Sequence, residues 1–169
     1  MLPSNVSKLL NEQINKEMFS AYLYFDMANY YISKGYNGFA NWFNVQAREE
    51  MDHALLFVKY LQNNNFDVSL AAIAKPEIPF KDLREPLTEA LKHEEFVTAS
   101  IHAIYAEALK TNDYRTMEFL QWFIKEQGEE EKNATDLIIS YDLHGSQGRF
   151  ALDGKLHART YSAPSLELD

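Results

Sequence analysis

The sequence predicts an all-α protein: a four-helix up-down-down-up bundle with one long crossover and a short C-terminal fifth helix. Two observations carry this prediction. The 6 glycines and 5 prolines fall almost entirely between long uninterrupted segments, and such residues punctuate secondary structure. Within those segments, apolar residues recur at steps of three and four, which is the spacing of a helix face turned toward a core.

The first two helices are expected at 4–34 and 38–64. Neither glycine nor proline interrupts the first range from Ser4 onward, and Gly35 and Gly38 bracket a short turn between the two. A short connection places consecutive bundle helices side by side and antiparallel. We therefore expect these two segments to form one helical hairpin.

The third and fourth helices are expected at 84–111 and 114–143, with Asp113 as the N-cap of the fourth. The segment 65–83 before them holds two prolines and shows no strong period. If extended, it could reach roughly 60 Å, which is enough to run the length of the bundle. Such a crossover makes the second and third helices parallel.

The chain divides into a bundle at 1–144 and a short helix with a flexible tail at 145–169. Gly154 weakens the short helix, because glycine disfavours helix interiors. The final ten residues are expected to be mobile, as chain termini often are. The apolar residues expected to pack against the bundle end or neighbouring chains are Phe150, Leu152 and Leu156.

Composition narrows the class of partner. Apolar residues make up 46% of the 169 residues, which fits one globular domain. The net charge of −9 disfavours nucleic acid and anionic membranes and suits cations. The absence of cysteine excludes disulfides, zinc–thiolate sites and cysteine nucleophiles. The chain begins without a basic, then apolar, signal segment and holds no membrane-length apolar run, so a cytoplasmic location is expected.

Two sets of polar residues share one spacing. Each set has an acidic residue, a second polar residue 33 positions later and a third one three positions beyond that. Separated by 77 positions, the sets are Glu17, Glu50 and His53, and Glu94, Gln127 and Glu130. Residues three apart share one face of a helix. One Glu from each of two helices, with such a pair from each of the other two, is the ligand pattern of a di-iron carboxylate bundle.

The repeated carboxylates interrupt the apolar stripes at mid-helix. Burying carboxylates is costly unless they are paired or bind a metal, and four in one layer repel one another. Iron ions could neutralise them, with the imidazole as a further ligand. A single Glu is more often solvated, but the shared spacing and inward position favour the metal interpretation.

Other aromatic residues leave alternatives open. Tyr24 lies seven positions beyond Glu17 on the same face. It could hydrogen-bond to a ligand, donate an electron or serve only as a core aromatic. Trp122 is better explained by packing than by redox chemistry. The histidines that lie off the ligand register are expected at the surface: His93, His102, His144 and His157.

Several segments carry a family resemblance. They are 10–17 (LNEQINKE), 49–53 (EEMDH), 92–94 (KHE), 119–122 (FLQW) and 126–132 (EQGEEEK). In these segments, and along nearly its whole length, the chain resembles the non-haem bacterial ferritins. The resemblance implies a homo-oligomeric shell of 24 subunits. It also implies oxidation of ferrous iron by dioxygen or peroxide at a di-iron ferroxidase centre, with storage of a ferric oxyhydroxide mineral.

The resemblance also implies a role for each ligand. Glu17, Glu50 and His53 would bind the first iron. Glu50 would bridge to the second iron, which Glu94 and Glu130 would complete. These five residues are therefore the expected ligands of two ferroxidase-site ions.

Further roles follow from the same resemblance. Gln127 would hydrogen-bond within the site, and Tyr24 would lie beside it. The positions of a third iron site in the family are occupied here by Glu49, Glu126, Glu129 and Glu130. Haem-containing bacterioferritins have Glu-x-x-His in the fourth helix, whereas this chain has Gln127 and Glu130 there, so no haem is expected.

The chain departs from vertebrate ferritins at one expected iron route. Their acidic threefold-channel positions correspond here to Met117 and Leu120. Two other functions remain open. The same ligand set could serve a di-iron oxygenase or peroxidase acting on a separate substrate. A metal-free helical interaction module would leave the inward carboxylates without an explanation.

Overall fold

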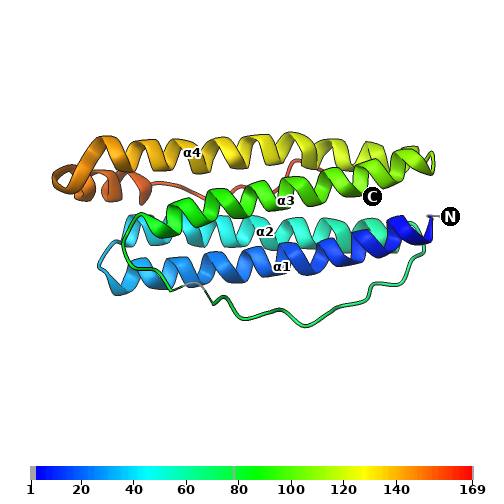
Figure 1. Cartoon of the computed structure of the whole chain (residues 1–169), viewed down its shortest axis with the longest axis horizontal. Coiled ribbons are helices and arrows are strands. Elements are labelled where there is room, and N and C mark those ends of the chain that lie inside the picture. The colour runs from blue at the N-terminus through cyan, green and yellow to red at the C-terminus, as the bar shows by residue number, and fades with distance from the viewer. Residues whose placement is uncertain (1–2, 78, 169) are drawn as a thin grey trace.

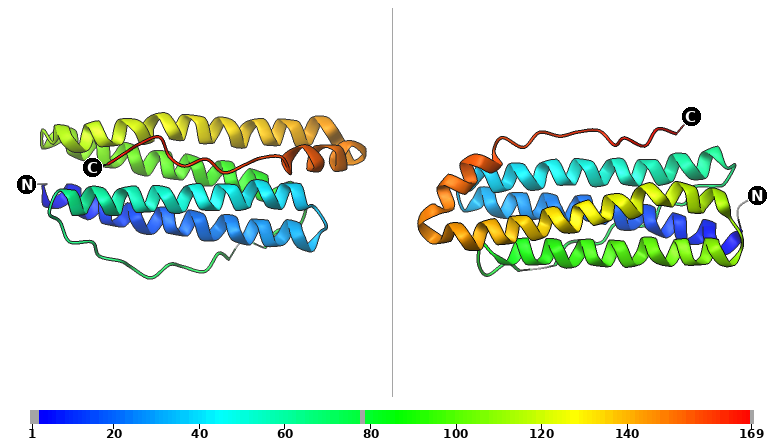
Figure 2. Two further views of the ribbon diagram at one scale, coloured as in Figure 1. Left: turned by 180° about the vertical axis from the view of Figure 1, so that it is seen from behind. Right: turned by 90° about the horizontal axis from the view of Figure 1, so that it is seen from above.

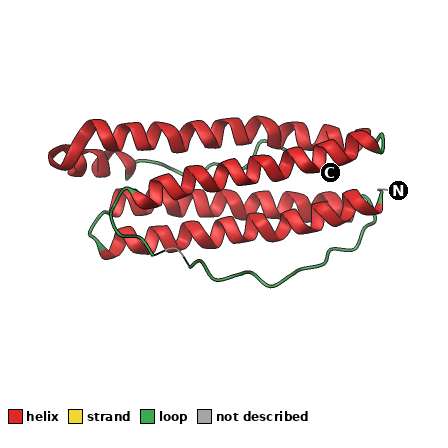
Figure 3. Ribbon diagram, in the orientation of Figure 1, coloured by secondary structure: helices red, strands yellow, loops and turns green. Residues whose placement is uncertain are grey.

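Four helices make up the fold in the computed structural model, which describes residues 3–77 and 79–168 (Figure 1). They are α1 Ser4–Ser33, α2 Asn37–Asn63, α3 Glu85–Lys110 and α4 Tyr114–Leu156. The described residues contain no strand (Figure 3), so the all-α prediction is confirmed. None of the described helices combines the length and the apolar character that crossing a bilayer requires.

Tight turns join the helices of each hairpin. Gly35 between α1 and α2 has a φ of 80°, and Asn112 between α3 and α4 has a φ of 54°. Glycine and asparagine tolerate this left-handed region better than other residues do. Asp113 caps α4 as predicted, because its carboxylate accepts a hydrogen bond from the Thr116 backbone N–H at 3.3 Å.

The crossover from α2 to α3 runs along the bundle beside α1 (Figure 1). Two asparagines of α1 hold it there. The Asn11 Oδ1 accepts from the Ser69 backbone N–H at 2.8 Å, and the Asn15 Nδ2 donates to the Ala72 carbonyl at 3.1 Å. The crossover makes α2 and α3 parallel, and the predicted up-down-down-up topology follows.

A polar layer divides the apolar core into two clusters. One cluster includes Leu10, Phe57, Ile101 and Phe123. The other includes Met27, Phe43, Leu87 and Leu137. Between them lie buried carboxyl, amide and imidazole side chains from all four helices: Gln13, Glu17, Gln46, Glu50, His53, Glu94, Gln127 and Glu130. The two clusters fix the bundle on either side, so the polar side chains converge on one level.

The C-terminal part of α4 is divided at Gly145. The fourth helix was expected to end at residue 143 and to be followed by a separate, weak fifth helix. The backbone at Gly145 (φ 56°, ψ −168°) is non-helical, so the expected break is present, and a second helical stretch that contains Gly154 follows it and ends at Leu156. Leu152 is buried in the second cluster, whereas Phe150 is exposed.

Asp153 docks this segment on the start of α2. Its Oδ1 accepts from the backbone N–H of Gly38 at 2.8 Å and of Phe39 at 3.0 Å. A carboxylate at a helix N-terminus is stabilising, because the first N–H groups lack helical partners. A Cβ at position 38 would stand 1.7 Å from the Asp153 carbonyl oxygen, so this approach needs glycine.

The last described residues, 158–168, form what we call the C-terminal strap. It runs over the face formed by α2 and α4, back toward the end of the bundle where the chain begins (Figure 2). The Tyr161 hydroxyl donates to Asp52 at 2.5 Å, and the Trp122 Nε1 donates to the Ser165 hydroxyl at 2.9 Å. These contacts give the strap a defined path. That the tail is flexible in solution stays a prediction.

Replacing Gly38 with alanine is expected to lower the free energy of unfolding by about 1–3 kcal/mol, the usual cost of overpacking. The reason is that the added methyl group meets backbone of residue 153, which cannot rotate away. Urea unfolding would measure the change. Gly128→Ala is the matched control, since nothing lies within 4 Å of its Cβ position. That control should be neutral or stabilising by up to about 1 kcal/mol, and equal stability of both variants would contradict the tight docking.

Candidate metal centre

The four helices bring five candidate ligands to one level of the bundle. Glu17 comes from α1, Glu50 and His53 from α2, Glu94 from α3 and Glu130 from α4. Each side chain is buried, with at most 5% of its surface exposed. The i, i+3 spacing on α2 points both of its ligands to the same side.

Glu17, Glu50 and His53 form the tightest group. Each offers one ligand atom, and these atoms lie within 4.8 Å of one another. The His53 Nδ1 lies 3.4 Å from the Glu50 Oε2. Both of these atoms and the Glu17 Oε2 are buried without a hydrogen-bond partner. Buried polar atoms are almost always satisfied, so three such atoms facing one another are suited to a cation.

Glu94 and Glu130 have neutral donors on the other side of the layer. The Tyr24 hydroxyl donates to one Glu94 oxygen, and the Gln127 Nε2 donates to the other at 3.1 Å. The Gln46 Nε2 donates to the Glu130 Oε2 at 2.6 Å. These bonds orient the carboxylates without adding a positive charge.

Two glutamines of this layer were not assigned a role from the sequence. Gln13 donates to Glu17 at 2.7 Å, and Gln46 also donates to Glu50 at 3.3 Å. Each glutamine precedes its carboxylate by four residues, which is the helical spacing that lets side chains meet. That repeated i, i+4 pair was the sequence signal that could have identified them.

Burial raises the pKa of every carboxyl group in the layer. It raises the pKa of Glu17 to about 8, with repulsion from Glu50 as the next cause. It likewise raises the pKa of Glu94 to about 8, again with repulsion from Glu50. The pKa values of Glu50 and Glu130 rise for the same reasons. A divalent or trivalent cation would compensate the buried negative charges and their mutual repulsion, and carboxylate oxygens with one imidazole suit iron.

The four residues predicted for a third iron site do not share one environment in the structure. Glu49 and Glu126 line a small chamber of about 210 Å³ beside His53. Burial raises the pKa of both carboxyl groups. Glu129 is exposed, pairs with Lys125 at 3.5 Å and does not line the chamber. Glu130 belongs to the buried layer.

Comparison with known proteins identifies the family. The family model for the Ferritin-like domain matches residues 7–141, which contain every candidate ligand. The chain belongs to the ferritin family. Ferritins are iron-storage proteins, so iron is the metal to consider at the buried layer.

Curated relatives and solved structures agree with this family. Bacterial non-heme ferritin of Campylobacter jejuni is 38% identical over 88% of this chain and 89% of its own length. Bacterial non-heme ferritin of Staphylococcus aureus is 37% identical over 95% and 98%. An open pore ferritin of the archaeon Archaeoglobus fulgidus superposes with a TM-score of 0.92 at 34% identity, over 95% of this chain and 100% of its own.

In this ferritin-family protein, the structure agrees with the sequence prediction for Trp122 but not with that for His93. Trp122 packs edge-on to His53 with 5.5 Å between ring centroids, consistent with the expected packing role. His93 was expected at the surface, which is wrong. It is half-buried, bonds the Ser20 hydroxyl at 2.7 Å and lies edge-on to Tyr24. Burial lowers the pKa of His93 to about 4.

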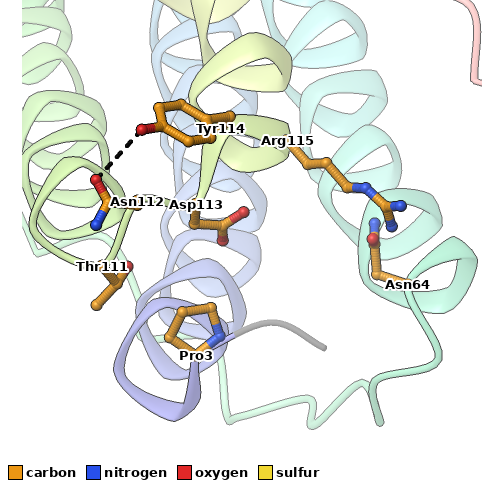
Figure 4. Close-up of a pocket in the computed structure, with 7 residues that line it drawn as sticks. All are labelled: Pro3, Asn64, Thr111, Asn112, Asp113, Tyr114 and Arg115. Carbon is orange, nitrogen blue, oxygen red and sulfur yellow. Dashed lines mark hydrogen bonds between the residues drawn. The ribbon is translucent and has the colours of Figure 1, made fainter.

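The bundle end where α3 meets α4 holds a separate cavity of about 320 Å³, lined by Pro3, Asn64 and residues 111–115 (Figure 4). Asn64 is eleven residues beyond His53, about 16 Å along α2. Met117 and Leu120 stand at the positions of the acidic threefold-channel residues of vertebrate ferritins. Leu120 is buried and Met117 packs against the core. This cavity is therefore distinct from the candidate metal centre.

Proposed function

We propose that this protein stores iron and acts as a ferroxidase, with ferrous iron and dioxygen or peroxide as substrates. The observation that carries the proposal is the group of orphaned ligand atoms on Glu17, Glu50 and His53 within the buried carboxylate layer. Burial disfavours the charged forms of four carboxyl groups in this layer, and cations bound among them would stabilise those forms. Membership of the ferritin family supports the same function.

In the proposed reaction, two ferrous ions bind side by side. Glu17 and His53 hold the first ion, Glu94 and Glu130 the second, and Glu50 bridges both. Each ion loses one electron, and dioxygen takes up both electrons together with two protons to leave as hydrogen peroxide; with peroxide as oxidant, the same two electrons reduce it to water. Water supplies the oxygen atoms of the ferric oxyhydroxide product, and the protons it loses return to solvent. The fixed carboxylates stabilise the charge that the ions gain.

Neighbouring side chains of the layer have supporting roles in the proposal. Gln127 and Tyr24 both donate to Glu94, so they hold that carboxylate in one orientation. Tyr24 is also the aromatic hydroxyl nearest the layer along α1 and is suited to donate an electron. A third iron would bind Glu49, Glu126, Glu129 and Glu130. For that site, the Glu129 side chain would have to leave Lys125.

A separate organic substrate, as in a di-iron oxygenase or peroxidase, finds less support. The chamber beside His53 has a volume of about 210 Å³. Pockets for organic ligands usually have about 300–1,000 Å³. The chamber suits ions, water and dioxygen better than a larger substrate.

We also propose that the chain assembles into a 24-subunit shell and works in the cytoplasm. Large apolar side chains are exposed on one face of α1 and on the crossover: Tyr22, Phe25, Ile32, Leu70 and Ile73. Exposed apolar groups gathered on neighbouring elements indicate a protein–protein surface.

All proposed ligands lie within 1–144, so the proposed C-terminal unit 145–169 supplies none of them.

Aerobic iron loading of the purified protein tests the function and the assembly together. Ferrous iron is added in portions, and size-exclusion chromatography with light scattering and iron analysis follows. The expected result is a large particle that retains far more iron than its binding sites can hold. Iron that stays at two or three ions per chain, however much is added, would instead favour the oxygenase or peroxidase alternative.

A further inference from the structure

Arg159 of the C-terminal strap reaches toward the metal centre across the α2–α4 face. One terminal nitrogen donates to the Glu49 Oε2 at 2.6 Å and to the Gln46 Oε1 at 2.9 Å. The other donates to the Trp42 carbonyl at 3.2 Å, and the guanidinium lies 4.5 Å from the centre of the Trp42 ring. The side chains of Arg159 and Glu49 are only 21% and 17% exposed. The strap thus places a half-buried cation on a proposed iron ligand.

Gln46 links this cation to the buried layer. Its amide oxygen accepts from Arg159, while its amide nitrogen donates to Glu130 at 2.6 Å and to Glu50 at 3.3 Å. An amide has distinct donor and acceptor ends. A guanidinium at the oxygen end therefore keeps the donor end turned toward the carboxylates, so Arg159 and Glu130 are two hydrogen bonds apart.

The strap also walls the chamber beside the centre. His53, Glu49, Glu126 and Trp122 form one side, and residues 162–165 form the other. Glu49 thus lies at the edge of the chamber, between the strap cation and His53. A cation that approaches the centre from the α2–α4 face meets this carboxylate, and the guanidinium already occupies it.

We propose that Arg159 is a displaceable stand-in for ferrous iron. In the metal-free protein it holds Glu49 and Gln46 in place, and an ion arriving at this face replaces it at Glu49 and releases the strap there. This positioning role rests on the proposed function, because it requires that metal ions reach the buried layer.

Exchange is physically reasonable at this position. The pair is largely buried, and losing one partner of such a pair is costly when the other charge is left uncompensated. Exchange avoids this cost, because the arriving ion replaces the positive charge at Glu49. A divalent ion carries twice the charge of the guanidinium and binds the carboxylate oxygen directly. Because both cations compete for one carboxylate, metal binding and strap docking must oppose each other reciprocally. Removing Arg159 should therefore tighten metal binding at Glu49.

Zinc is the probe, because it accepts carboxylate and imidazole ligands without redox chemistry. The chain has two tryptophans, so a Trp122→Phe background leaves Trp42, which carries the stacked guanidinium, as the sole tryptophan to be excited selectively. Adding Zn²⁺ should shift Trp42 emission when Arg159 is present and leave it unchanged in Arg159→Gln. Calorimetric titration of full-length Arg159→Gln should show Zn²⁺ binding at least about fivefold tighter at the weaker sites.

Two matched variants isolate the guanidinium at Glu49. Arg149→Gln removes the same charge from a side chain that stacks on Tyr141 instead, and should keep the parent Zn²⁺ affinity. Arg159→Lys keeps the charge and should give an intermediate affinity with a retained Trp42 response. If the parent and Arg159→Gln bind Zn²⁺ with equal affinity and Trp42 emission does not change in the parent, the stand-in role is overturned. That outcome would leave the metal centre unaffected. Absence of Zn²⁺ binding in every chain would overturn the centre as well.

Discussion

Replacing Glu50 with alanine is expected to abolish rapid oxidation of ferrous iron. Glu50 is fully buried, and one of its oxygens faces Glu17 and His53 while the other accepts from Gln46. The carboxylate therefore stands between the two proposed iron positions. Its loss removes the bridge and a ligand of each ion. We expect the initial rate to fall ~100-fold or more, beyond the usual effect of altering a residue that only supports a ligand.

Stopped-flow measurement of oxygen uptake with ferrous iron would check this result. Glu95→Ala is the matched control, because Glu95 is exposed on α3 next to a proposed ligand. It should oxidise iron at the parent rate. Removing Glu50 also removes a source of repulsion, so the variant should stay helical by circular dichroism. Parent kinetics in a folded Glu50→Ala protein would rule out the proposed bridge.

The buried polar layer could be predicted from the sequence because helical spacing is local. Once four helices are assigned, residues three and four apart must share a face. Glu50 and His53 then fall on the same apolar stripe as Phe57. The two tight turns also followed from local signals, such as Gly35 and Asp113. The structure agrees with these predictions because each depends on a few neighbouring residues.

The C-terminal region could be predicted only in part. The fourth helix was expected to end just before Gly145, and the backbone leaves the helical region at that residue. The docking of the following segment on α2 through Asp153 could not be predicted, because Gly38 and Asp153 are far apart in the chain. Arg159 is about 110 residues from Glu49 in the chain, and no local pattern links the two. Gln46 precedes Glu50 by one helical turn, yet its role depends on that distant partner.

The metal-free protein is expected to lose stability as the pH rises from about 5 to about 8. In the folded state, burial raises the pKa of Glu17 and Glu94 to about 8 from an ordinary value of 4.5. Between these values the unfolded chain has released the protons that the folded chain keeps. The free energy of unfolding then falls by up to about 1.4 kcal/mol per pH unit for each such carboxyl group.

Bound metal should reverse this dependence. Metal ligands must be deprotonated, so Zn²⁺ binds more tightly as the pH rises, and binding to the folded state alone stabilises it. The difference in melting temperature between Zn²⁺-loaded and chelator-treated protein should therefore increase from about pH 5.5 to about pH 8.

Scanning calorimetry at several pH values would measure both trends, and two neighbouring residues provide the matched test. Glu94→Gln removes one buried titrating group but keeps an amide oxygen for Tyr24 to donate to, so it should flatten the slope of the metal-free protein. Glu95→Gln changes an exposed carboxylate and should leave the slope unchanged. A metal-free melting temperature that stays constant across this range in the parent protein would show that the four carboxyl groups are not held protonated together. The case for a cation among them would then rest on geometry alone.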